Sequence, residues 1–214
     1  MSNEFPMHGP GVGSSPPIDP KRQAIIRHAR KAFVSEGYAA TKIEPIAREA
    51  GVSTATLYAL FDGKAQLFSA VIDDAAHDFA RQMALVRTVD GDARQQLTSF
   101  ARAYADFMSD PFVRAVFRLV MAERPRFQAV ALRFFEKGRA EFGATLIGIL
   151  IALSKSGALV PIERPSWAAG HLMGMIEHPV FFVPLVTGDE IKVRRSNAEV
   201  VEDAVETFLA RYAA

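Results

Sequence analysis

The feature that most constrains this chain is the segment 51–58, where one helical pattern gives way to another without a linker. Gly51 can adopt the left-handed backbone conformation that ends a helix, and Ser53 can cap the N-terminus of the next one. Val52 and Leu57 occupy the positions of a hydrophobic staple across that cap. We therefore predict a helix-turn-helix, whose second helix fits the major groove of DNA.

Two helices are predicted before this turn. The first has apolar residues at every fourth position, at Ile25, Ala29 and Phe33, and ends at Gly37. The second is expected to begin at a capping box formed by Thr41 and Glu44. Pro45 falls in its first turn, where it loses a backbone donor, so its start can shift by a residue or two.

Residues 22–72 resemble the DNA-binding domain of the TetR/AcrR family of bacterial transcriptional regulators. The matching residues are Ile25-Ile26, Ala29, Ala32-Phe33, Glu36-Gly37-Tyr38, Ile46-Ala47, Ala50-Gly51-Val52-Ser53, Thr56-Leu57-Tyr58, Phe61, Lys64 and Leu67-Phe68. Leu60 departs from the family, which often has His or another polar residue there, and Ala55 stands where Gly is common.

The predicted DNA-binding residues fall into two groups. Thr54, Ala55 and Thr56, at the start of the recognition helix, are expected to face the bases, and Ser53, which caps this helix, is also predicted to be a DNA-binding residue. Phosphates are expected to be held by Thr41, Lys42, Tyr58 and Lys64. The expected partner is a near-palindromic double-stranded operator whose half-sites are about 34–36 Å apart or a multiple of that distance.

Charge is distributed as a DNA-binding segment requires. The net charge of the 214 residues is only +1, but residues 20–64 contain eight Lys or Arg and four Asp or Glu. The chain contains no cysteine, which excludes disulfides and thiolate chemistry. We expect a cytoplasmic protein without a membrane span, because the longest apolar run, around 144–153, is about half a span long. Residues 1–20 are expected to form a disordered arm.

The rest of the chain predicts further helices, so the expected fold is all-α. A three-helix helix-turn-helix domain over 21–68 is followed by a larger helical domain over 69–214. Asp62 is expected to cap a long helix, residues 126–155 to form another that ends at Gly157, and Ser196 and Glu199 to form a capping box for the last. The second half resembles the AefR-like C-terminal domain of part of the TetR family, on Arg118-Leu119-Val120-Met121-Ala122-Glu123, Pro125-Arg126-Phe127, Phe135-Glu136, Gly157-Ala158-Leu159 and Ala168-Ala169. That resemblance implies a domain that binds a small effector and forms a homodimer.

Eight of the sixteen phenylalanines lie between positions 100 and 142, a density that fits either an ordinary helical core or an apolar ligand pocket. The resemblance favours the pocket. The predicted ligand-binding residues are Tyr104, Phe107, Phe117, Arg118, Phe135, His171, Met175 and His178.

The homodimer is predicted to form through the helices over 165–186 and 196–212, packed as a four-helix bundle. The predicted interface residues are Ala169, Gly170, Gly174, Val201, Val205, Phe208 and Leu209, although an amphipathic helix can equally bury such a face within its own chain.

The sequence contains no catalytic or metal-binding motif, so we predict no enzyme activity, no cofactor and no metal. The leading hypothesis is a ligand-responsive regulator, most simply a repressor released by a small apolar or aromatic molecule. Two alternatives stay open: a DNA-bound scaffold controlled by a protein partner, and a helical enzyme acting on small apolar substrates.

Overall fold

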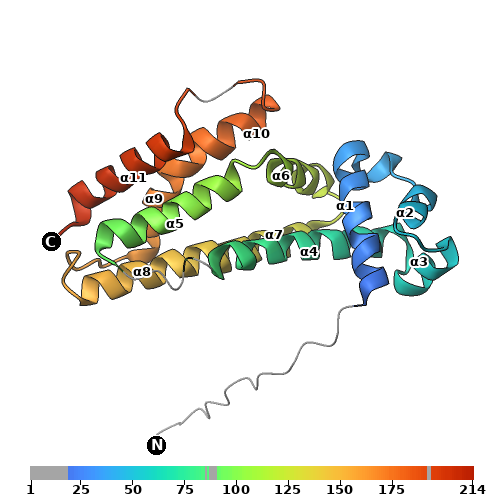
Figure 1. Cartoon of the computed structure of the whole chain (residues 1–214), viewed down its shortest axis with the longest axis horizontal. Coiled ribbons are helices and arrows are strands. Elements are labelled where there is room, and N and C mark those ends of the chain that lie inside the picture. The colour runs from blue at the N-terminus through green and yellow to red at the C-terminus, as the bar shows by residue number, and fades with distance from the viewer. Residues whose placement is uncertain (1–18, 85, 87–90, 192–193) are drawn as a thin grey trace, which may run out of the picture.

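The computed structural model describes residues 19–84, 86, 91–191 and 194–214, and every regular element in these ranges is helical (Figure 1). The all-α prediction is therefore confirmed. A small group of helices forms one end of the molecule: α1 (Pro20–Ala40), α2 (Ile43–Glu49) and α3 (Thr54–Leu60). The larger part comprises α4 (Gly63–Ala84), α5 (Ala93–Met108), α6 (Pro111–Glu123), α7 (Gln128–Gly138), the π-helical turn η1 (Arg139–Gly143), α8 (Ala144–Lys155), α9 (Pro165–Glu177), the π-helical turn η2 (His178–Phe182), α10 (Val183–Thr187) and α11 (Asn197–Tyr212).

Helix α1 begins one residue inside the segment predicted to be a disordered arm. Asp19 caps it by accepting a hydrogen bond from the Lys21 N–H at 2.9 Å, and Pro20 occupies its first turn. Residues 1–18 of the predicted arm lie outside the described residues. Gly37, the predicted end of α1, has φ +75 and forms a kink near its C-terminus.

The predicted capping box at Thr41 is wrong. Helix α2 begins at Ile43, with Lys42 as an N-cap that makes no side-chain cap. The Thr41 hydroxyl instead donates to the carbonyl oxygens of Gly37, at 2.7 Å, and Ala32, at 3.3 Å, and is buried there. Pro45 is tolerated because it is the third residue of α2, where its missing N–H would have had no partner within the helix.

The turn before α3 matches the prediction. Gly51 has φ +70, and the Ser53 side chain accepts the Thr56 N–H at 3.0 Å. At the start of α4 the predicted cap differs, because the backbone N–H of Asp62 donates to the Gln66 Oε1 at 2.5 Å and the Asp62 carboxylate makes no such bond.

Helix α4 joins the two parts of the molecule, and the predicted domain boundary at 68/69 falls inside it (Figure 1). Near its start, the Phe68 ring lies 5.3 Å from Phe33 of α1 and 5.2 Å from Tyr38. About three turns further along, the Phe79 ring lies 5.0 Å from Phe134 of α7. One helix therefore makes aromatic contacts in both parts of the molecule, and the buried residues of the two parts form a single hydrophobic cluster.

The remaining helices pack around α4 in two sets. The predicted helix over 126–155 is interrupted only by the π-helical turn η1, so that α7 lies along α4 and α8 continues beyond it (Figure 1). Helices α5, α9 and α11 pack on one another, and Ser196 and Glu199 form the predicted capping box.

An ion pair ties the segment after α10 to α6. Arg114, only 6% exposed, donates through Nε to the Asp189 carboxylate at 2.8 Å, and Arg118 donates to the same group at 3.0 Å. Desolvation raises the pKa of Asp189, but the hydrogen bonds and charges of the two arginines outweigh it and hold that pKa below the usual 3.8.

We expect Asp189→Asn to lower the free energy of unfolding by about 1 kcal/mol near neutral pH, because it removes a charged acceptor from buried Arg114. Since the folded-state pKa is depressed, the contribution is present above the unfolded-state pKa and is lost as the pH falls through the folded-state value. Urea denaturation of both proteins should therefore show a difference near neutral pH that shrinks below about pH 3.8. The exposed neighbour Glu190→Gln is the control, and a difference independent of pH would contradict the ion pair.

Candidate nucleic-acid interface and effector cavity

The first turn of α3 presents short side chains to solvent. Thr54 and Ala55 are exposed, and Tyr58, one turn on, is 52% exposed. Lys42, before α2, is also exposed. The Thr56 hydroxyl lies 2.9 Å from the Ser53 Oγ, so these two predicted DNA-binding side chains also form the cap of α3. An exposed, capped helix start of this kind can enter a groove without further rearrangement.

Two predicted phosphate contacts have other partners. Thr41 is 3% exposed and its hydroxyl bonds within α1, so it cannot reach a phosphate without unfolding that end. Lys64 Nζ donates to the Ala39 carbonyl at 3.0 Å and lies 4.8 Å from the centre of the Tyr38 ring. The Lys64 side chain therefore bridges α4 and the end of α1.

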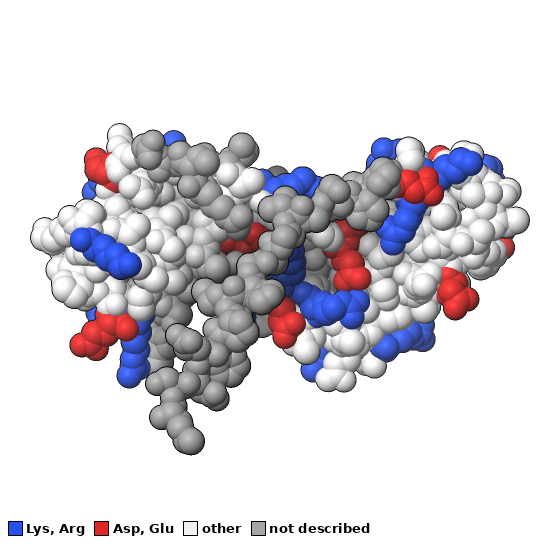
Figure 2. Space-filling model, turned by 90° about the horizontal axis from the view of Figure 1, so that it is seen from below, with Lys and Arg blue, Asp and Glu red and all other residues white. Residues whose placement is uncertain are grey.

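Charge on this end of the molecule is mixed. Figure 2 shows Lys and Arg side chains interspersed with Asp and Glu on the face that it presents. Residues 20–64 carry the local excess of basic residues, and among them exposed side chains such as Lys42 are candidates for phosphate contacts.

The larger part contains a cavity of about 300 Å³ between α4, α5, α6, α7 and α9. Its walls are mostly rings, from Phe79, Tyr104, Phe117, Phe134, Phe135, Phe142 and Phe181. Met108 and Met173 complete the apolar lining, Gly138 leaves room beside Phe79, and Arg139 borders the cavity from the exposed side of η1. The lining suits an apolar or aromatic molecule.

One polar pair lies in this apolar cavity. The Tyr104 hydroxyl donates to Oε1 of Glu177, and Tyr104 is 1% exposed. Burial, together with the charge of Glu177, raises the pKa of Tyr104 well above its usual value. Burial also raises the pKa of Glu177, against the opposing effect of the Tyr104 hydrogen bond.

A surface groove of about 380 Å³ adjoins the cavity between α6 and α7. It shares Phe117, Phe134 and Phe135 with the cavity and continues over Met121 and Leu132, which are both more than half exposed. Cavity and groove therefore form one continuous apolar surface.

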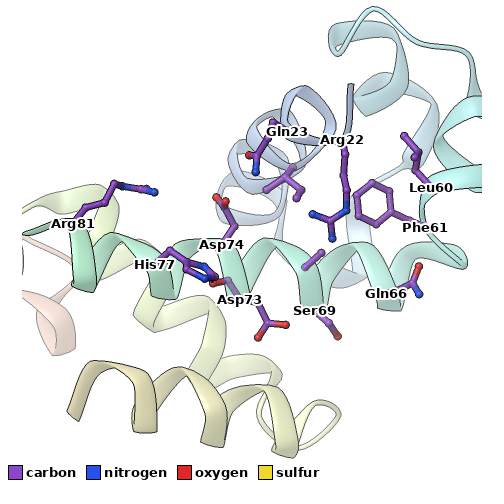
Figure 3. Close-up of a pocket in the computed structure, with 12 residues that line it drawn as sticks. Arg22, Gln23, Leu60, Phe61, Gln66, Ser69, Asp73, Asp74, His77 and Arg81 are labelled. Carbon is purple, nitrogen blue, oxygen red and sulfur yellow. The ribbon is translucent and has the colours of Figure 1, made fainter. Parts of the chain in front are cut away.

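A second cleft, of about 530 Å³, opens between α1 and α4 (Figure 3). It has mixed polarity: Arg22 lies 5.1 Å from the Phe61 ring centre, Asp74 points toward α1, and Asp73 points away toward Arg133 of α7, 3.3 Å distant. Two of its charged residues are paired within the chain, Asp73 with Arg133 and Arg81 with Asp78, and the cleft was not predicted.

Two family models match this architecture. The model for bacterial regulatory proteins of the tetR family matches residues 25–71, and the model for the AefR-like transcriptional repressor C-terminal domain matches residues 95–214. The chain belongs to the TetR family. The predicted resemblance is thereby confirmed in both halves.

Individual relatives agree with the family. The HTH-type transcriptional activator FasR of Mycolicibacterium smegmatis is 31% identical over 103 residues, which are 48% of this chain and 47% of FasR. The chain thus matches about half the length of that relative. A TetR-family regulator from Mesorhizobium loti MAFF303099 has a similar structure, with 28% identity, a TM-score of 0.74 and coverage of 91% of this chain and 97% of that one. The flavonoid-responsive regulator FrrA has 25% identity, a TM-score of 0.68 and coverage of 90% and 97%.

The structure of this TetR-family protein brings only part of the predicted ligand set together. Tyr104, Phe117 and Phe135 line the cavity. Phe107 packs behind it against Phe79, and Arg118 is engaged by Asp189 and the Pro184 carbonyl. Met175, His171 and His178 lie outside the lining, and both histidines are exposed on the outer face of α9 and η2. Glu177 lines the cavity but was not among the predicted ligand-binding residues, although a lone acid in an apolar helix is itself a signal.

Most of the predicted dimer interface is also placed differently. Ala169, Val201, Val205 and Phe208 are buried inside the protomer, where α11 packs on α5 and α9, and Leu209 is half-buried. Only Gly170 and Gly174 are exposed. They share the outer face of α9 to α10 with Trp167, Phe182 and Val186, which are all more than half exposed.

The stretch Pro165–Thr187 is long and apolar enough to span a membrane by length and composition, a test that core helices of soluble proteins also pass. It packs here on α5, α8 and α11, and Glu177 within it pairs with Tyr104. The described structure therefore uses it as one side of a helical core.

Two neighbouring residues test the DNA-facing surface. We expect Lys42→Ala to reduce the slope of log affinity against log salt by about one, because it removes one phosphate contact. Thr41→Val is the matched control: it should lower the free energy of unfolding by about 0.5–1.5 kcal/mol and leave the salt slope unchanged. Fluorescence anisotropy with labelled operator at several salt concentrations measures the salt slopes of both variants. An unchanged slope in Lys42→Ala together with a reduced slope in Thr41→Val would refute this assignment.

Proposed function

We propose that this TetR-family regulator is a homodimer in the cytoplasm whose affinity for a palindromic operator is controlled by a small apolar or aromatic molecule bound in the cavity. The observation that supports this most is the continuity of α4. Its first turns carry Phe68, which packs against α1, and its middle carries Phe79, which lines the cavity. A ligand that displaces Phe79 therefore acts on the same rigid helix that supports the helix-turn-helix.

A second set of contacts also connects α1 with the larger part of the molecule. Phe127, just before α7, lies 4.6 Å from Phe68 and 4.9 Å from Tyr38. Arg30 of α1 donates to Asp78 of α4 at 2.7 Å and lies 5.1 Å from the Phe112 ring of α6. Helices α6 and α7 also supply Phe117 and Phe134 to the cavity, so α4 and α6, which both pack on α1, also line the cavity.

We infer that the protein is a repressor and that ligand binding weakens its binding to DNA. The match to the AefR-like transcriptional repressor domain supports this sign, although FasR is named as an activator. The aromatic cavity and the likeness to FrrA, which is named as flavonoid-responsive, support an aromatic effector.

The proposed switch makes a quantitative prediction. Fragments selected from genomic DNA by the full-length protein should yield an operator, and a flavonoid panel should identify a compound that releases it. Bound operator should then lower the affinity of the protein for that compound by the same factor by which the bound compound lowers its affinity for operator, about 5–150-fold. Phe117→Ala should reduce the response, whereas Val160→Ala, on the surface, should not. Calorimetric titrations with equal ligand affinity in the presence and absence of operator would rule out the switch.

We propose that the dimer forms through the outer face of α9 to α10. Gly170 and Gly174 lie within α9, where glycine costs about 0.5–1 kcal/mol relative to alanine. A Cβ at either position would meet nothing within 4 Å in the protomer, so no contact inside the chain requires a glycine there. Close approach of a second chain, with Trp167 and Phe182 covering it, explains both glycines.

The glycines also supply a test that leaves the fold intact. Gly174→Glu should convert dimers to monomers in analytical ultracentrifugation, because it puts a charge into the proposed contact while the protomer has room for it. Gly148→Glu is the matched control: this glycine is also helical, exposed and open, but lies on α8, and its variant should stay dimeric. A dimeric Gly174→Glu protein with unchanged affinity would refute this interface.

A further inference from the structure

We propose that the effector is an uncharged, elongated apolar molecule that donates a hydrogen bond, from a hydroxyl or phenol, to the carboxylate of Glu177. Its apolar part would lie among the aromatic rings of the cavity and extend out of the cavity along the groove between α6 and α7. This inference rests on the proposed function and specifies the chemistry of its effector.

The polar end of the ligand is assigned from the hydrogen bonds of Glu177. Oε1 accepts the Tyr104 hydroxyl, and among the described residues no donor is directed at Oε2. Among the described residues, Arg30 Nε is the only fully buried side-chain nitrogen or oxygen atom without a hydrogen-bond partner. Oε2 of Glu177 also has no partner among these residues, so it is not fully buried and can be reached from the cavity. A buried carboxylate oxygen is an acceptor, and the group that completes it must be a donor.

The same geometry disfavours a ligand carboxylate beside Glu177. A ligand carboxylate beside Glu177 would put two like charges in a site lined by rings, and one of them would have to bind a proton. The Tyr104 hydroxyl cannot compensate, because it already donates to Glu177. The remaining cation that borders the cavity is Arg139, which lies on the exposed side of η1. An acid would therefore have to bind in the reverse orientation, with its charge at the rim.

The length of the ligand is assigned from the groove. Phe117, Phe134 and Phe135 belong to both the cavity and the groove, and beyond them the side chains of Met121 and Leu132 are each more than half exposed. An alkyl chain that follows this path from Glu177 covers those two side chains.

Three para-substituted probes test the polar end: para-octylphenol, para-octylanisole and para-octylbenzoic acid, titrated calorimetrically into the full-length protein without DNA. We expect the phenol to bind about tenfold or more tightly than the anisole, which cannot donate, and also more tightly than the acid. Glu177→Gln should narrow both differences, since the amide carries no charge and offers a weaker acceptor. Circular dichroism checks that the variant is folded.

Three outcomes would overturn the inference: equal binding of phenol and anisole, tightest binding of the acid together with its loss in Arg139→Gln, or binding of none of the probes. Ligand affinity is measured without DNA, so these failures leave operator binding untouched. Conversely, a protein that prefers the phenol but selects no DNA fragment would refute the proposed function while keeping this selectivity.

The groove has its own test. Leu132→Glu changes an exposed side chain, so it should leave the fold intact and weaken para-octylphenol several-fold. The short probe para-ethylphenol should bind this variant and the wild type equally, because it ends inside the cavity. Equal effects on both probes, or none on either, would contradict the assigned path.

Discussion

The structure depends on a row of aromatic contacts along α4. Phe68 packs against Phe33, Tyr38 and Phe127, and Phe79 packs against Phe134 and Phe142. Because a single helix carries both rings, the packing around Phe68 and the packing around Phe79 cannot shift independently without bending α4. The predicted boundary at 68/69 separates two sequence patterns, but mechanically α4 belongs to both halves. A cavity placed beside Phe79 is therefore in mechanical contact with the helix-turn-helix, although it lies outside it.

Features fixed by residues a few positions apart were predictable from the sequence. The turn at Gly51 with its Ser53 cap, the break at Gly157 and the box at Ser196 and Glu199 each need only local geometry, and the structure shows them. The box at Thr41 failed because a tertiary position overrode the local preference: Thr41 is buried, and its hydroxyl bonds to α1. At Thr41, packing took the group that the local signal needed, whereas at exposed Asp62 the predicted cap was replaced by a hydrogen bond from its backbone N–H to Gln66.

The candidate site was harder to predict, because helical periodicity shows which residues share a face but not which face turns inward. His171 and His178, seven residues apart, do share a face, yet that face is the outer one. Glu177 precedes His178 by one position, about 100° around the helix, and points into the cavity. The same ambiguity affected Val201, Val205 and Phe208, whose apolar face is buried against α5 and α9 of their own protomer.

Two polar groups are incompletely paired, one in the cavity and the other where α1 packs against the larger part of the molecule. Oε2 of Glu177 faces the cavity without a donor, and Arg30 Nε is buried without an acceptor between α1, α4 and α6. Burial lowers the pKa of Arg30, although the charges of Asp74 and Asp110 oppose this effect. A buried donor without an acceptor costs about 1–3 kcal/mol. The packing of α1 against α4 therefore leaves one polar group unsatisfied, which raises the free energy of this arrangement. A ligand that favours another arrangement then has a smaller free-energy difference to overcome than the aromatic packing alone would impose.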